Sequence, residues 1–195
     1  MIPRIAGIFL CAVFSAHAGT KAPVPMNSAP DNFGFHVTLD SGYLWKTGGN
    51  SAHDYEAVPT LVSLLTPEMF SLWDGKISVR NRFTLIHEAY TSGPEDYYFG
   101  AAAAPSLEYE IDRFTTAFLA VGGGAGWINS SGGAEGQGQD LAFNWFAHAG
   151  LRRQVFESLE LSTGAYFTHH SNRGMTDPNP GIDLLGFTVG LGWRF

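Results

Sequence analysis

The closing segment, residues 184–195, constrains the fold more than any other part of the chain. Large apolar side chains occupy its odd positions, and small or polar ones occupy its even positions. The odd positions are Leu185, Phe187, Val189, Leu191, Trp193 and Phe195, and the even ones include Gly186, Thr188, Gly190, Gly192 and Arg194. Strict alternation with a period of two indicates a β-strand with one apolar face.

Seven further segments are predicted to be strands. They cover residues 33–45, 53–64, 76–88, 97–109, 114–127, 140–152 and 157–169. Segment 53–64 is the weakest of these predictions, because it alternates poorly and contains Pro59, which cannot donate to a sheet ladder. Several strands carry charged residues opposite the apolar face, for instance Arg80 and Arg82. A soluble sandwich would face such charges to water and would need fewer exposed aromatics.

The first 18 residues have the pattern of a secretory signal peptide. A single Arg4 precedes a short apolar run, and Ala16-His-Ala18 provides the cleavage site, so cleavage is expected after Ala18. Cys11, the only cysteine, lies inside this segment, which leaves the mature chain without a disulfide or a thiol nucleophile. Residues 19–32 are predicted to form a flexible N-terminal lead, and residues 33–195 one domain.

Composition points to a membrane barrel. The chain has 24 glycines, 14% aromatic residues and only 15% charged residues, and after the signal it has no run of about 20 apolar residues that could form a transmembrane helix. Hydrophobicity spread over alternate positions is typical of a transmembrane barrel. We therefore predict an all-β fold, an eight-stranded antiparallel transmembrane β-barrel of the bacterial outer membrane, with an interior filled by side chains. A net charge of −7 without a basic cluster argues against nucleic acid as a partner.

The connections between strands support this prediction and suggest an orientation. From the third strand onward, longer polar connections alternate with short ones, as in barrels with long outer loops and short periplasmic turns. With both termini in the periplasm, the 170–183 loop would face the cell exterior. The 65–75 connection is longer than a periplasmic turn should be, and nothing in the sequence explains its length.

Two polar residues interrupt the apolar parity near the end of the chain. His169 and Ser171 fall on the outward face, and Asp183 begins the next strand on the same parity. A serine, a histidine and an orienting acid are the parts of a nucleophilic hydrolase, and at outer-leaflet depth they would meet acyl esters. The alternative is a pair of rim residues without catalytic function. His170 points inward by parity and is expected to be a satisfied interior polar group.

The same stretch resembles a family motif. His169-His-Ser-Asn-Arg-Gly174, followed by Pro178-Asn-Pro-Gly-Ile-Asp183, is similar to the pattern of the lipid A 3-O-deacylase family, the PagL-type outer-membrane acyloxyacyl hydrolases. That pattern is His-x-Ser-Asn-x-Gly, then Pro-Asn-x-Gly, then an acid twelve positions after the serine. The resemblance covers residues 166–195 at the level of the motif. It departs at Asp183, where the best-known members have glutamate.

The resemblance implies a role for each matching residue. Ser171 would be the nucleophile, His169 the general base and then acid, and Asp183 the orienting acid. Asn179 would be an oxyanion donor, assisted by Asn172 or by the backbone amide near Gly174. No metal or other cofactor is implied, and the histidines on other segments lack metal-ligand spacing. A shorter acid must approach His169 more closely than a glutamate would.

We expect from these observations an outer-membrane serine esterase that removes the ester-linked 3-position acyl chain from lipid A, the anchor of lipopolysaccharide. One alternative is a non-catalytic small barrel, an adhesion or structural module that binds through the 128–139 loop. Another is an outer-membrane phospholipase. A homodimer is compatible with the sequence, which does not fix the oligomeric state.

Overall fold

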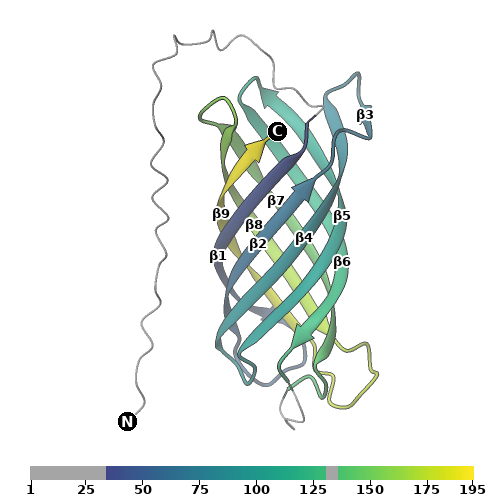
Figure 1. Ribbon diagram of the computed structural model, residues 1–195. Coiled ribbons are helices and arrows are strands. Elements are labelled where there is room, and N and C mark those ends of the chain that lie inside the picture. Colours follow the sequence, from purple (N-terminus) through teal and green to yellow (C-terminus); the bar gives the residue numbers. More distant parts are fainter. Residues whose placement is uncertain (1–33, 131–135) are drawn as a thin grey trace.

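The computed structural model describes residues 34–130 and 136–195. The expected signal peptide, the lead and part of the 128–139 loop lie outside these residues. The described part contains nine strands and no helix (Figure 1). The strands are β1 (His36–Gly48), β2 (Glu56–Leu65), β3 (Phe70–Leu72), β4 (Ile77–Ser92), β5 (Tyr97–Asp112), β6 (Thr115–Ile128), β7 (Leu141–Gln154), β8 (Leu159–Ser171) and β9 (Ile182–Arg194).

Eight of these strands close into an antiparallel barrel, as predicted. Neighbouring strands pair in chain order from β4 to β9, β9 pairs with β1, and β2 pairs with both β1 and β4 to complete the ring. No helix in the described residues is long and apolar enough to cross a membrane, a result that does not bear on β-barrels, which cross with strands.

The barrel has two distinct ends, visible in Figure 1. The loop end carries the connections 49–55, 93–96, 129–140 and 172–181. The turn end carries the connections 66–76, 113–114 and 155–158 and the C-terminal Phe195. Apart from 66–76, the connections at the turn end are short, in keeping with the alternation read from the sequence.

The long 66–76 connection contains an element that the sequence did not reveal. β3 pairs with the first residues of β4, with Phe70 opposite Val79 and Leu72 opposite Ile77. The turn between the two strands uses positive φ angles at Trp73, Asp74 and Gly75. The connection therefore extends the sheet beyond the barrel rim as a short hairpin (Figure 1).

β2 is a full barrel strand, although its sequence predicted it least well. Its inward face carries Ala57, Pro59 and Leu61, and its outward face is also largely apolar, so the polar–apolar contrast is lost. The β1–β2 ladder passes from Ser41–Thr60 to Leu44–Ala57 and skips Pro59. A proline is tolerated there because the ladder does not need its missing N–H.

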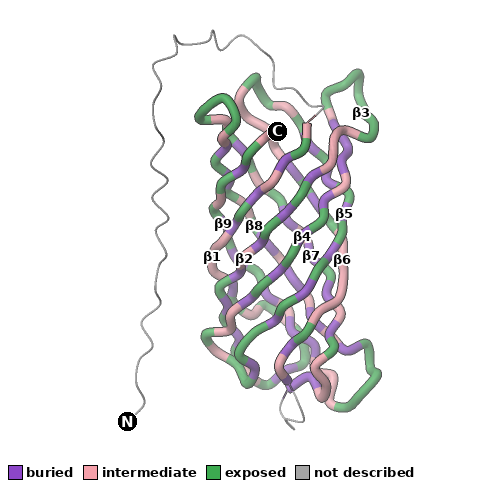
Figure 2. Tube along the Cα trace, viewed as in Figure 1, coloured by how far each residue is buried: buried purple, intermediate pink, exposed green. Residues whose placement is uncertain are grey.

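Burial alternates along the strands, as Figure 2 shows. The charged residues expected inside are buried, except for the half-buried Arg194, and form ion pairs with one another. These pairs are Arg80–Glu108, Arg152–Glu108, Arg194–Glu160 and Arg82–Asp40. The outer wall is apolar, and the tryptophans on the outward parity are 37–53% exposed, in line with an interfacial aromatic belt. The interior thus combines these ion pairs with a cluster of buried apolar side chains, and the apolar outer wall is the reverse of a soluble fold.

Candidate active site

The candidate acid and base face each other across two strands. β8 and β9 pair so that His169 lies directly opposite Asp183 at the loop end of the barrel. The His169 Nδ1 and Asp183 Oδ1 atoms are 2.5 Å apart, and the two side chains are 28% and 27% exposed. An ionised carboxylate only accepts hydrogen bonds, so in the neutral imidazole Nδ1 carries the proton and Nε2 keeps its lone pair. Nε2 is thus available as a base on the outer wall.

Ser171 lies on the same outward face as His169. It is the last residue of β8, half-buried, and it pairs with Phe143 of β7. Within the described part of the chain, the Ser171 hydroxyl makes no hydrogen bond to His169. Catalytic hydrogen bonds are often long in unliganded structures and shorten when substrate binds. Strand geometry supplies the proximity here, because residues i and i+2 are neighbours on one face.

β8 and β9 extend two residues further into the loop end than the sequence indicated. The expected loop of 170–183 shortens to 172–181, since His170 still pairs with Ile182. His169, Ser171 and Asp183 therefore all belong to strands, where the ladder fixes their relative positions.

Asn172 holds the loop that follows the serine. It is fully buried, and its Nδ2 donates to the carbonyl oxygens of Gln137, Thr176 and Pro178 at 2.5, 2.6 and 3.2 Å. Its Oδ1 accepts the Gly174 N–H at 2.8 Å. The Asn172 amide and the Gly174 N–H are thus committed to the loop itself in this structure.

Asn179 is placed differently. Its Oδ1 accepts the Asn172 backbone N–H at 2.9 Å. Its Nδ2 has no hydrogen-bond acceptor among the described residues, and the residue is only half-buried. Of the three predicted oxyanion donors, Asn179 is the one whose amide N–H groups are not already used by the loop.

A glycine of β1 makes room for the acid. Gly48 lies opposite Asp183 at an irregularity in the β1–β9 register between Lys46 and Gly48. A Cβ added at Gly48 would lie 2.7 Å from Asp183 Oδ2, closer than real Cβ contacts. Sequence reasoning missed Gly48, because a glycine near a strand end gives no signal of the residue that it will face.

Aromatic side chains surround the site. Trp145 of β7 pairs with His169, and the two ring centroids are 6.1 Å apart. Trp145 also packs against Phe167 at 4.7 Å. Parity within segment 140–152 puts Trp145 on the outer face, but it does not reveal the contact with His169, because register between strands cannot be read locally.

His170 faces the barrel interior, as expected from parity. It is fully buried, its Nε2 lies 2.8 Å from Glu88 Oε2, and its ring packs on Tyr98 with centroids 4.2 Å apart. His169 is thus the histidine of the pair that can reach a substrate on the outer wall.

A buried network at the loop end connects the loops around the site. The Tyr55 hydroxyl donates to Glu95 Oε2 at 2.7 Å, and Glu95 Oε1 accepts from Ser130 Oγ and the Gln137 N–H. Burial, and then the hydrogen bond to Glu95, raise the pKa of Tyr55. Because the Gln137 carbonyl accepts from Asn172, the network reaches the loop that follows Ser171.

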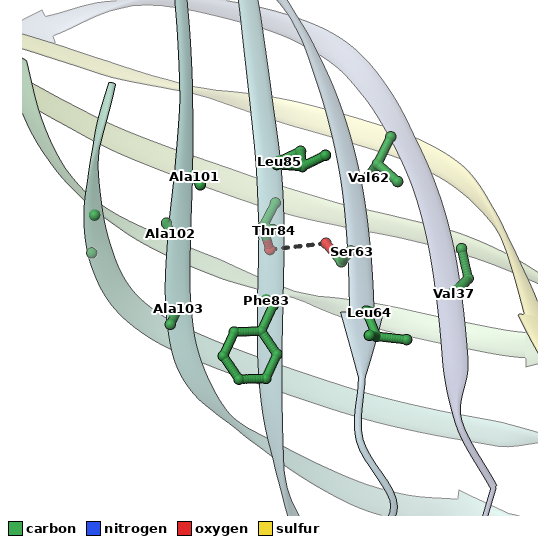
Figure 3. A pocket seen from close by; sticks show the side chains of 12 residues that line it. Val37, Val62, Ser63, Leu64, Phe83, Thr84, Leu85, Ala101, Ala102 and Ala103 are labelled. Carbon is green, nitrogen blue, oxygen red and sulfur yellow. Dashed lines mark hydrogen bonds between the residues drawn. The ribbon is translucent and has the colours of Figure 1, made fainter. Parts of the chain in front are cut away.

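Away from His169, Ser171 and Asp183, the described residues offer no metal site, but they line an apolar groove. No group of three or more His, Cys, Asp or Glu side chains among the residues described could hold a metal ion. A shallow groove on the outer wall crosses β2, β4 and β5, where Leu64, Phe83 and Ala103 line it (Figure 3). None of His169, Ser171 and Asp183 lines this groove.

Comparisons with known proteins agree with the fold and indicate a family. Residues 17–192 match the family described as lipid A 3-O-deacylase (PagL). A crystal structure of the outer membrane enzyme PagL is similar, with 17% identity, a TM-score of 0.63, and coverage of 80% of this chain and 97% of that one. Neisserial surface protein A (NspA) is similar at 12% identity and a TM-score of 0.55, with 83% and 97% covered. At these identities the two structures show a shared fold only. No curated protein sequence gives a match.

Proposed function

This chain belongs to the lipid A 3-O-deacylase family, and we propose that Ser171, His169 and Asp183 are the triad with which it acts. It is an outer-membrane hydrolase that removes the ester-linked 3-position acyl chain from lipid A. The observation that carries the proposed triad is the His169–Asp183 hydrogen bond beside Ser171 on the outer wall. A site on this wall meets the acyl chains of its substrate within the membrane.

In the proposed mechanism, His169 Nε2 takes the Ser171 proton while Oγ attacks the ester carbonyl carbon. The resulting oxyanion accepts a hydrogen bond from the Asn179 amide. When the tetrahedral intermediate collapses, the C–O bond to the sugar breaks, and His169 returns the proton to the leaving sugar oxygen. Water then attacks the acyl-serine with His169 as base, which releases the fatty acid and restores Ser171.

Asp183 holds the His169 tautomer and stabilises the imidazolium that forms during attack. Aspartate is long enough in this chain because the two residues are direct cross-strand partners, whose Cβ atoms are about 4.5–5.5 Å apart. Asn172 and Gly174 would assist by shaping the loop that positions Asn179.

We also propose that residues 1–18 direct export, and that the loop end, with the triad, faces the cell exterior. The long connections at the loop end and the C-terminus at the turn end support this orientation. The acyl ester of an outer-leaflet glycolipid would then lie at the depth of Ser171.

Mass spectrometry of lipid A from cells that express the wild type, Ser171→Ala or His169→Asn tests the triad. We expect the wild type to remove one ester-linked chain and both variants to leave lipid A intact, with heat-modifiable gel mobility showing folded barrels. His87→Asn is the matched control, because His87 is an exposed histidine of β4 without a carboxylate partner in the described part of the chain. Full activity of either triad variant would refute the assignment, and loss of glycerophospholipid chains instead would favour the phospholipase alternative.

A further inference from the structure

The connections at the loop end of the barrel carry several acidic residues and a single arginine, which follows the nucleophile. These four connections contain the carboxylates of Asp54, Glu95, Asp96, Asp140 and Asp177 in the described residues. Arg173 is the only lysine or arginine in the sequence of these connections. The nearby Lys46 of β1 is already bound to the carbonyl oxygens of Ser51 and His53. Arg173 is exposed, and it forms no ion pair with any described carboxylate. An exposed arginine without a counter-ion is available to an anion from outside the chain.

Arg173 is held close to the proposed nucleophile. Its guanidinium carbon lies 5.5 Å from the centroid of the Phe143 ring, a cation–π contact. Phe143 is the cross-strand partner of Ser171. The Cα atoms of Ser171 and Arg173 are two residues apart in the chain, which limits their separation to about 7 Å. Arg173 and Ser171 thus share Phe143 as a neighbour, which places the guanidinium on the same side of the site as the ester that Ser171 would attack.

The φ angle of Arg173 is imposed by the structure of the 172–181 loop, because an arginine by itself seldom adopts it. Its φ is 57°, in the left-handed region that residues other than glycine seldom adopt, and Gly174 follows with φ 73°. The buried Asn172 closes this turn by accepting the Gly174 N–H. A residue kept in an uncommon conformation next to a functional site is a reasonable candidate for a role in that site.

We propose that Arg173 binds a phosphate carried on the sugar unit that bears the cleaved acyl chain, and that it selects phosphorylated glycolipids. The inference rests on the proposed function of Ser171. A guanidinium presents two parallel N–H donors that match two phosphate oxygens, and this pairing is stronger than a neutral hydrogen bond. Arg173 is thus a specificity residue that orients the head group, while the triad acts on the ester.

Two synthetic acylated glucosamines test the proposal, identical in their 3-position ester and differing only in a sugar phosphate. Arg173→Ala is expected to lower kcat/KM on the phosphorylated compound by about tenfold, mainly through KM, as loss of a charge-assisted hydrogen bond predicts. On the compound without phosphate, the variant should match the wild type. Arg173→Lys keeps the charge but loses the paired donors. Its kcat/KM on the phosphorylated compound should therefore lie between those of the wild type and Arg173→Ala. The matched control is Arg113→Ala, because Arg113 is also exposed and lies 4.5 Å from the Phe114 ring, but at the turn end.

An equal loss on both compounds would overturn the proposal, since it would show that Arg173 only supports the loop. Unchanged kinetics on the phosphorylated compound would overturn it as well. A binding measurement distinguishes failure of the phosphate site from failure of the proposed function. In a Ser171→Ala background, which cannot cleave, adding Arg173→Ala should weaken binding of the phosphorylated compound in detergent micelles by about tenfold. Equal affinity of the single and double variants would refute the phosphate site whether or not the wild type cleaves either compound.

Discussion

His169 and Asp183 are direct cross-strand partners, and their Nδ1 and Oδ1 atoms lie 2.5 Å apart. The ten-residue connection between β8 and β9 does not set this distance. The β-ladder sets it, because it fixes which residues of the two strands face each other. A short acid can therefore serve where the family motif has glutamate.

Asp183→Asn should lower kcat by about 10³- to 10⁴-fold, as the equivalent change does in other serine triads, because an amide does not hold the required imidazole tautomer. Fatty-acid release from lipid A in mixed micelles measures this loss. The barrel should keep its heat-modifiable mobility, since Asp183 is only partly buried. Near-normal turnover of Asp183→Asn would mean that another group orients His169.

Gly48→Ala should lower kcat by about 10- to 100-fold through displacement of the Asp183 carboxylate, since small misplacements of catalytic groups have effects of this size. The control is Gly192→Ala, whose added Cβ would lie at an ordinary 3.5 Å from its nearest neighbour in the barrel interior. Both variants should unfold close to the wild-type temperature. If Gly48→Ala retains full kcat, the space beside Asp183 is not required for orientation of the acid.

Asn179→Asp should lower kcat by about 10²- to 10³-fold, the usual effect of losing one oxyanion donor. The substitution keeps the oxygen that accepts the Asn172 N–H, so the loop remains supported while the amide donor is lost. Asn172→Ala is the informative comparison, because it should expose the 172–181 loop to proteases, whereas Asn179→Asp should not. Unaltered kcat in Asn179→Asp would assign the oxyanion to a different donor.

High pH should loosen the loop end. The pKa of Tyr55 is raised by burial, so the folded state favours the protonated hydroxyl that donates to Glu95. The resulting stability is fully present below the ordinary tyrosine pKa of about 10 and is lost as the pH rises above it. Limited proteolysis by an alkaline protease should therefore cut wild-type loops faster above this pH. Tyr55→Phe should be cut readily at neutral pH and should change little with alkalinity, and a wild-type cleavage rate independent of pH would contradict the assignment.

Much of the fold could be predicted from the sequence, because alternation with period two is a local property. It predicted the clearest strands, their inward and outward faces, the buried charges, and the outward placement of His169 and Ser171. It was weakest for β2, where both faces are largely apolar, and it missed β3, which is too short for a periodic signal.

The sequence by itself determined which residues of the candidate site share a face, and its motif indicated the chemistry. Only the tertiary structure decided which residues meet across strands: Asp183 with His169, Gly48 with Asp183, and Phe143 with Ser171. It also decided that Asn172 serves its own loop while the Asn179 amide stays available. The physical reason is that register comes from pairing between segments distant in sequence, and no local pattern encodes it.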